Sequence, residues 1–215
     1  MGCHSLEYMR YERMADDLGI SHEIAQQNLN FSEGNIGDLM KIAAPAKEQK
    51  KWFGATPPDL TLVARARGVE WLYTYLRNFY QDDKRPYGVN NRVFKDVGMP
   101  HVMLELQGMP KCAPGPVHAE NGGIKRDPLT REEILVDAKT GVALNPCGRL
   151  VVEKAGKLKP AEFDQAVGDL VSFLAYAGEP AALKRQRMGV YALFFVSLFF
   201  IFAWLLNREY WKDVH

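Results

Sequence analysis

The stretch GVYALFFVSLFFIFAWLL, residues 189–206, contains no charged side chain. A helix of this length rises about 27 Å, which is close to the ~30 Å hydrocarbon core of a bilayer. The alternative is a helix buried in a protein core, but every face of this one is apolar. Trp204, Tyr210 and Trp211 also stand where aromatic residues favour the headgroup region. The stretch therefore predicts a transmembrane anchor near the C-terminus.

Basic residues flank this span, three at its start and two at its end: Lys184, Arg185, Arg187, Arg208 and Lys212. Cytoplasmic segments of membrane proteins are enriched in such residues, so the count slightly favours a cytoplasmic N-terminal side. A difference of one charge is too small to decide the orientation.

The composition is that of a globular protein. Of the 215 residues, 47% are apolar and 25% are charged, which excludes a disordered or fibrous chain. The formal net charge of +1 gives no cationic excess for phosphates, so nucleic acid is not an expected partner. The chain has three cysteines, Cys3, Cys112 and Cys147. In an oxidising compartment two of them can form a disulfide, and one then remains for another role.

Hydrophobic spacing predicts a mostly helical fold with long loops. The clearest helix covers residues 160–178, where apolar residues recur on one face, Pro160 suits the first turn and Gly178 suits the stop. Residues 81–158 are rich in Gly and Pro and show little periodicity. Further helices are expected at 5–18, 22–30, 37–44 and 59–80, the last bending at Gly68, and short strands at 102–106, 134–137 and 150–153.

The N-terminus, Met1-Gly2-Cys3-His4-Ser5, contains the end of the C-x-x-C-H pattern that attaches a c-type haem. In that pattern two thiols bond to one edge of the ring, and the His binds iron. The first of those cysteines would lie one position before Met1. A Cys-His pair alone is weak evidence, because such pairs are usually structural.

Several segments, taken together, are specific. They run in order along the chain: Cys3–Tyr11 (CHSLEYMRY), Gly54–Arg67 (GATPPDLTLVARAR), Val97–Pro100 (VGMP), Phe173–Pro180 (FLAYAGEP), Lys184–Gly189 (KRQRMG) and Arg208–Asp213 (REYWKD). In this order they resemble the cytochrome c1 family, in its proteobacterial type. The resemblance spans nearly the whole chain and implies a c-type cytochrome haem domain followed by one C-terminal transmembrane helix.

The resemblance also implies how haem c is held. Cys3 would be the second thioether cysteine, and His4 and Met99 would be the two axial ligands of the iron. Such His/Met ligation leaves no open position on the metal, so it suits electron transfer. No side chain is expected to perform bond chemistry itself.

Around these ligands, Arg67 would hold a haem propionate through its planar guanidinium, and Pro57 and Pro58 would line the pocket beside His4. The other histidines are expected to be ordinary surface or loop residues: His22, His101, His118 and His215.

Two cysteines lie in the part of the chain that matches the family least, residues 108–159. If this segment faces an oxidising periplasm, Cys112 and Cys147 are expected to form a disulfide, and two unpaired buried thiols are the alternative. The rest of the segment is expected to be surface loop.

Haem is attached outside the cytoplasm in this family, and no signal sequence is found in the chain. We therefore expect Met1 to be an internal residue of a longer protein, preceded by the first cysteine of C-M-G-C-H. A haem with a single thioether bond is the alternative.

The resemblance implies an electron-transfer subunit of ubiquinol–cytochrome c reductase, the dimeric cytochrome bc1 complex. It would take electrons from the Rieske iron–sulfur protein, beside cytochrome b, and pass them to cytochrome c. Residues 1–180 would be periplasmic, 181–207 would cross the inner membrane and 208–215 would be cytoplasmic. Three acidic pairs are candidate contacts for a cationic cytochrome: Asp16-Asp17, Asp82-Asp83 and Glu132-Glu133.

Two other interpretations stay open. One is another membrane-anchored c-type cytochrome, which should lack the PPDL…RAR segment. The other is a haem-free single-span binding or assembly protein, which would leave Met99 and Arg67 without a joint purpose.

Overall fold

The computed structural model describes residues 2–30, 32, 34–117, 135–136 and 143–212. The chain divides into two compact units, Met1–Gly178 and Glu179–His215. Helices hold about half of the described residues, and irregular segments and short strands join them, as the sequence predicted.

The elements of the first unit follow in this order: β1 (Leu6–Arg10), α1 (Tyr11–Leu18), α2 (His22–Asn28), β2 (Leu39–Met40), α3 (Ala46–Phe53), α4 (Val63–Arg67), α5 (Val69–Arg77), β3 (Phe79–Gln81), β4 (Val89–Asn91), α6 (Leu104–Gln107), β5 (Gly108–Val117), β6 (Leu135–Val136), β7 (Ala143–Ala155) and α7 (Pro160–Gly178).

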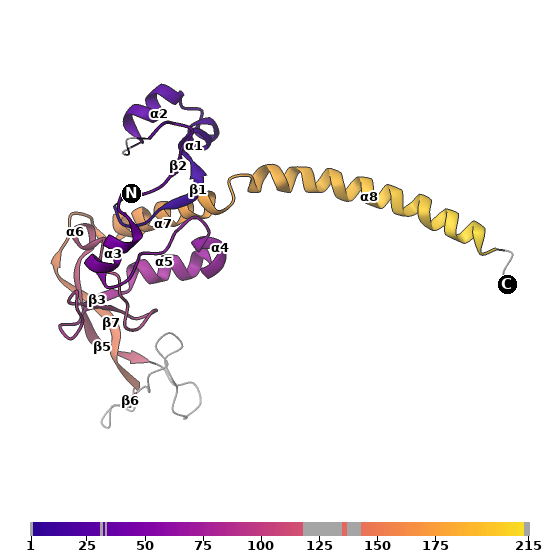
Figure 1. Ribbon diagram of the computed structural model, residues 1–215. Helices are drawn as coiled ribbons and strands as arrows, with labels where there is room; N and C mark the ends of the chain where they lie inside the picture. The colour runs from indigo at the N-terminus through magenta and orange to yellow at the C-terminus, as the bar shows by residue number, and fades with distance from the viewer. Residues whose placement is uncertain (1, 31, 33, 118–134, 137–142, 213–215) are drawn as a thin grey trace. The chain divides into compact units, whose positions relative to one another are not determined.

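The helix α7 organises the core of this unit. At its start the Glu162 carboxylate accepts a hydrogen bond from the Lys159 backbone N–H at 2.9 Å, which satisfies a donor that the helix leaves free. One face of α7 is buried and packs with Leu72 and Leu76 of α5 in a single apolar cluster. Figure 1 shows α7 lying beside α4 and α5. The residues of that buried face are Phe163, Val167, Val171, Leu174 and Ala177.

Short antiparallel strands complete the unit. β1 pairs with β2, and β3 pairs with β4, so that Phe79 lies opposite Asn91. β7 is the central strand of a sheet in the order β5-β7-β6 (Figure 1). Where β5 and β7 meet α6, Gly108 and Gly156 allow two backbones to approach so closely that a Cβ at either position would overlap a carbonyl oxygen.

Several sequence predictions need correction. The segment 37–44, expected to be helical, instead contains β2, because Leu39 and Met40 pair with β1. The expected helix at 5–18 begins with β1, and the expected strand at 102–106 is a turn that leads into α6. The bend expected at Gly68 is confirmed: it separates α4 from α5 with φ at 89°. The helix α3 was not predicted. Residues 108–159, expected to be surface loop apart from the cysteines and two short strands, contain the long antiparallel strands β5 and β7.

The second unit contains α8 (Ala182–Tyr210), which holds the uncharged stretch. The helix has a mean hydropathy of 2.3 in its most apolar part and is long and apolar enough to cross a membrane. None of its residues is buried within the protein, as expected of an anchor whose solvent is lipid.

Candidate functional site

The N-terminal arm lies along the PPDL segment, more than 50 residues away in sequence. The backbone N–H of Glu7 donates to the Asp59 carboxylate at 2.7 Å, and that of Tyr8 donates to the Thr61 hydroxyl at 3.3 Å. In return, the N–H of Leu60 donates to the Ser5 carbonyl oxygen at 3.0 Å. Two of the segments that carried the family resemblance therefore form one structural unit.

His4 is oriented by this pairing. Its Nδ1 lies 2.7 Å from the backbone carbonyl oxygen of Pro58, and the ring is half-buried. A carbonyl only accepts, so Nδ1 carries a proton and donates, and in the neutral ring Nε2 keeps a free lone pair. This is the arrangement that proteins use for a metal-binding imidazole, because the donated hydrogen bond fixes both the tautomer and the ring orientation.

Cys3 and Pro57 line the same small pocket, about 140 Å³ in volume, whose lining includes neither His4 nor Met99 nor Arg67. Cys3 is a free cysteine and is half-buried. Pro58 is exposed and contributes its backbone carbonyl rather than a wall of the pocket. The pocket therefore joins the thiol expected to bind haem with one of the two prolines expected to line its site.

Met99 lies in the loop that follows β4. Its side chain is half-buried and packs against both apolar clusters of the unit, the large one around α7 and a smaller one of Phe79, Val89 and Val97. The Tyr75 hydroxyl lies 3.7 Å from the Met99 Sδ, within reach of a hydrogen bond to sulfur. Burial raises the pKa of Tyr75 to about 12, so its hydroxyl remains a proton donor at neutral pH.

Arg67 lies at one end of a row of aromatic rings formed by Trp71, Tyr75 and Phe79. Its guanidinium carbon stands 5.3 Å above the Trp71 ring, and Trp71 stacks on Tyr75 with centroids 4.9 Å apart. Arg67 is exposed. Its side chain thus makes a cation–π contact while it stays exposed, which leaves its donors accessible to a carboxylate.

These residues suit a c-type haem. The half-buried thiol of Cys3, the imidazole of His4 with a free Nε2 and the thioether of Met99 supply the donor types that such a haem requires. Among the described residues no group of three or more His, Cys, Asp and Glu forms a conventional metal site. A His/Met-ligated haem needs no such group.

Two predictions about other residues can be compared with the structure. Cys112 and Cys147 form a disulfide, which links β5 to β7. His101, expected to be an ordinary surface or loop histidine, is buried instead and stacks on Phe79 with ring centroids 5.1 Å apart. Burial lowers the pKa of His101, so the ring is neutral at neutral pH. His118 and His215 lie outside the described residues.

Sequence reasoning missed Trp71 and Tyr75, the residues that connect Arg67 to Met99. The available signal was their spacing of four in a helix, which places two aromatic rings on one face. The sequence could not show that this face points toward Met99.

Comparison with known proteins decides the family. A model described as "Cytochrome C1 family" matches residues 151–214. A "Cytochrome c1" from Allochromatium vinosum is 50% identical over 214 residues, which cover 100% of this chain and 79% of the relative. The chain belongs to the cytochrome c1 family.

Two further relatives show the breadth of this similarity. An "Ammonia monooxygenase gamma subunit" from Nitrosomonas europaea is 38% identical over 213 residues, 99% of this chain and 77% of the relative. A "Cytochrome c1" from Rhodobacter capsulatus is 24% identical over 242 residues, 97% of this chain and 77% of the relative. Proteins of the cytochrome c1 family are membrane-bound electron carriers that hold haem c, and α8 fits the single-pass anchor.

Proposed function

We propose that this chain is the electron-transfer haem subunit of a cytochrome bc1 complex, taking electrons from the Rieske iron–sulfur protein and passing them to cytochrome c. Haem c would attach through Cys3, with His4 and Met99 as axial ligands of its iron. Bound haem supplies a one-electron iron couple, and the protein supplies the ligands and the surrounding medium.

The observation that carries the proposal is the hydrogen bond between His4 Nδ1 and the Pro58 carbonyl oxygen at 2.7 Å. This bond leaves Nε2 as the free nitrogen beside Cys3, which is what covalent attachment and axial ligation at adjacent residues require. The hydrogen bond also makes the imidazole a better electron donor to a metal, because the carbonyl stabilises the developing positive charge on the ring.

The apolar surroundings of Met99 support the second ligand. Buried Val97 and Phe79 limit the access of water to its neighbourhood, and Tyr75 donates toward the sulfur. A thioether ligand in such a medium favours the reduced, less charged state of iron, so it suits a carrier of relatively high potential. Arg67 would balance a propionate at the edge of the ring.

The topology would follow from the anchor. Residues 1–180 would form the periplasmic domain, 181–207 would cross the inner membrane and 208–215 would be the cytoplasmic tail. Cytochrome b would lie beside the anchor in a dimeric complex.

Three of the acidic residues expected to contact cytochrome c also make bonds within the protein. Asp16 pairs with His22 at 2.7 Å, Asp17 accepts from Tyr176 at 2.8 Å, and Asp82 accepts from Asn90 at 3.0 Å. Carboxylates already bonded within the protein are less available to a partner, and Glu132 and Glu133 lie outside the described residues.

The test uses the full protein purified from its native membranes. Haem that stays with the chain in a denaturing gel would establish covalent attachment. Met99→Leu conserves volume, so it should leave the fold intact while it lowers the reduction potential and opens the iron to added imidazole. The matched control is Met103→Leu, a buried methionine four residues later. Equal potentials and equal imidazole affinity in the two variants would remove Met99 from the site.

The relative named an ammonia monooxygenase subunit defines the alternative: an anchored carrier that serves a different oxidoreductase. Isolation of the complex under mild detergent distinguishes them. Copurification with cytochrome b and the Rieske protein supports the proposal, and their absence from an intact complex would contradict it.

A further inference from the structure

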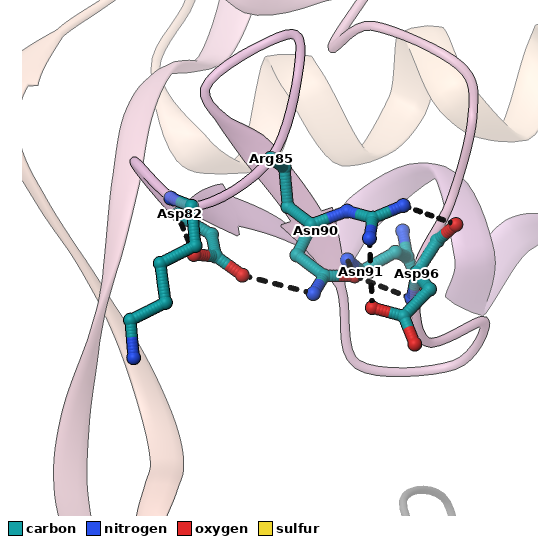
Figure 2. Close-up of polar contacts among 6 residues, drawn as sticks. Asp82, Arg85, Asn90, Asn91 and Asp96 are labelled. Atoms are coloured by element: carbon teal, nitrogen blue, oxygen red, sulfur yellow. Dashed lines mark hydrogen bonds and ion pairs between the residues drawn. The ribbon is translucent and has the colours of Figure 1, made fainter.

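We propose that Arg85, Asn90 and Asn91 form a loop clamp whose role is to position Met99 as an axial ligand. The inference rests on the proposed function, in which Met99 binds the haem iron. The clamp consists of polar side chains outside the ligand set that bind the backbone of the loop before Met99. Figure 2 shows Arg85 and Asn90 both bonded to Asp96 of this loop.

Asn91 fixes the start of this loop. Its side chain is 1% exposed, and its amide nitrogen donates to the Tyr75 carbonyl oxygen at 2.8 Å. Its side-chain oxygen accepts from the backbone N–H of Val93 at 2.8 Å and of Phe94 at 3.2 Å. One amide therefore ties the end of α5 to the first turn of the loop.

Asn90 ties the loop together further along. Its side chain is 4% exposed, and its oxygen accepts from the N–H of Asn91 at 2.9 Å and of Asp96 at 2.9 Å. Its nitrogen donates to the Asp82 carboxylate at 3.0 Å. The backbone N–H of Asp96, six residues ahead, is thereby bound to Asn90 of β4, and Figure 2 shows these two residues together.

Asp96 is the point where the backbone is strained. With φ at 61° it is the single non-glycine residue with positive φ in the described part of the chain. This conformation is unfavourable for most L-residues and persists where surrounding contacts impose it. Here Asn90 holds the N–H, and Arg85 donates to the carbonyl oxygen at 2.8 Å and contacts the carboxylate at 3.1 Å.

The strained residue precedes Met99 by three positions. Between them Val97 is buried in the cluster of Phe79 and Val89, so the chain is anchored again just before the ligand. The clamp also converges on Tyr75: Asn91 binds its carbonyl, and its hydroxyl reaches the Met99 Sδ. The same residue thus contacts both ends of the segment, which sets where the sulfur can stand.

A purely structural role for these amides predicts something different. It would lower the stability of the whole domain and leave ligation normal wherever the protein is folded. A positioning role predicts a folded protein in which Met99 leaves the iron more often. Added imidazole measures this directly, because its apparent affinity rises in proportion to the fraction of protein with the sixth position free.

The experiment compares Asn90→Ala, Asn91→Ala and Arg85→Ala in the full haem-loaded protein, far below their unfolding temperatures. We expect at least a tenfold rise in imidazole affinity for the two asparagine variants, about 1.4 kcal/mol. The charge-transfer absorption of methionine-ligated ferric haem should weaken in parallel. Arg85→Ala changes a residue near the surface, so it should fold even if an asparagine variant does not accumulate, and we expect about a threefold rise.

The matched control is Asn30→Ala. Asn30 is 9% exposed and organises another loop through the same kind of bonds, accepting from the Ser32 N–H at 3.0 Å. It should lose stability without any change in imidazole affinity. If all clamp variants behave like this control while Met99→Leu raises the affinity, the clamp is refuted and the ligand assignment stands. If Met99→Leu also has no effect, both are refuted.

Discussion

Replacing Tyr75 with Phe removes one hydroxyl and leaves the aromatic row in place. In the wild type the Tyr75 ring centroid lies 4.9 Å from that of Trp71 and 5.2 Å from that of Phe79. A Phe ring at this position can keep both contacts. What disappears is the hydrogen bond from the Tyr75 hydroxyl to the Met99 Sδ, which spans 3.7 Å. A donor at this position draws electron density from the sulfur and so disfavours ferric iron. The variant should therefore have a lower reduction potential.

The size of the change follows from the strength of such a bond. A net hydrogen bond contributes about 0.5–1.5 kcal/mol, and sulfur is a weak acceptor, so about 0.5–1 kcal/mol is expected here. For a one-electron couple, a tenfold change in equilibrium corresponds to about 59 mV. Only the difference in bond strength between the ferric and ferrous states counts, so the fall is at most about 20–40 mV.

The same substitution has a second signature at high pH. The pKa of Tyr75 is about 12 in the folded protein and near 10 in an unfolded chain. The folded state thus holds the proton more tightly, and stability is lost as pH rises from about 10 through 12. At 1.36 kcal/mol per tenfold, the upper limit is about 2.7 kcal/mol, and partial exposure of the ring reduces it to about 1–2 kcal/mol.

Potentiometric titration and denaturant unfolding at a series of pH values measure the two effects. Tyr73→Phe is the matched control, because it removes a hydroxyl two residues away on the same helix. The Tyr73 ring lies under the Arg77 guanidinium. A potential unchanged from wild type in Tyr75→Phe, or lowered equally in both variants, would refute the role assigned to the hydroxyl. Burial also raises the pKa of Tyr176 to about 12, so part of the alkaline loss should persist in Tyr75→Phe. An alkaline loss equal to that of the wild type would show that Tyr75 does not contribute.

Three further predictions concern the scaffold. Replacing Cys112 and Cys147 with Ser opens a loop of 35 residues and should lower the free energy of unfolding by up to about 4 kcal/mol. Denaturant unfolding with and without reductant measures this loss. Reaction of both thiols with a labelling reagent in the unreduced, unfolded protein would contradict the disulfide. Arg77 of α5 binds the Asp164 carboxylate of α7 through two nitrogens, at 2.6 and 2.7 Å. A double-mutant cycle to Ala should give a coupling free energy of unfolding of about 0.5–1 kcal/mol, and added salt should weaken it. Gly156→Ala would force a Cβ against the backbone atoms of Leu106 and Gly108, so we expect a lower unfolding temperature and poor accumulation. Normal stability would show that the two backbone segments can move apart.

Much of the helical framework could be predicted from local pattern. The period of the apolar residues in 160–178 predicts α7 because one face of a helix must be buried, and that face is buried. The break at Gly68 was also predictable, because glycine tolerates the positive φ found there. Segment 37–44 was assigned wrongly because β2 depends on a partner about 30 residues away, and a local pattern carries no information about that partner.

The candidate site divides in the same way. Sequence patterns singled out Cys3, His4, Met99 and the PPDL segment by their likeness to one family. Those patterns do not say how far apart these residues lie in space. The hydrogen bond from His4 to the Pro58 carbonyl joins residues 54 positions apart, and no spacing rule could have indicated it.

By itself, the sequence determined the family and the membrane anchor, because both depend on residue types in order along the chain. Only the tertiary structure decided which ring nitrogen of His4 is free and which residue donates to Met99. It also decided how the loop before Met99 is held. These depend on backbone carbonyls and amides, which every residue carries, so their partners are chosen by the fold and leave no mark in the residue types.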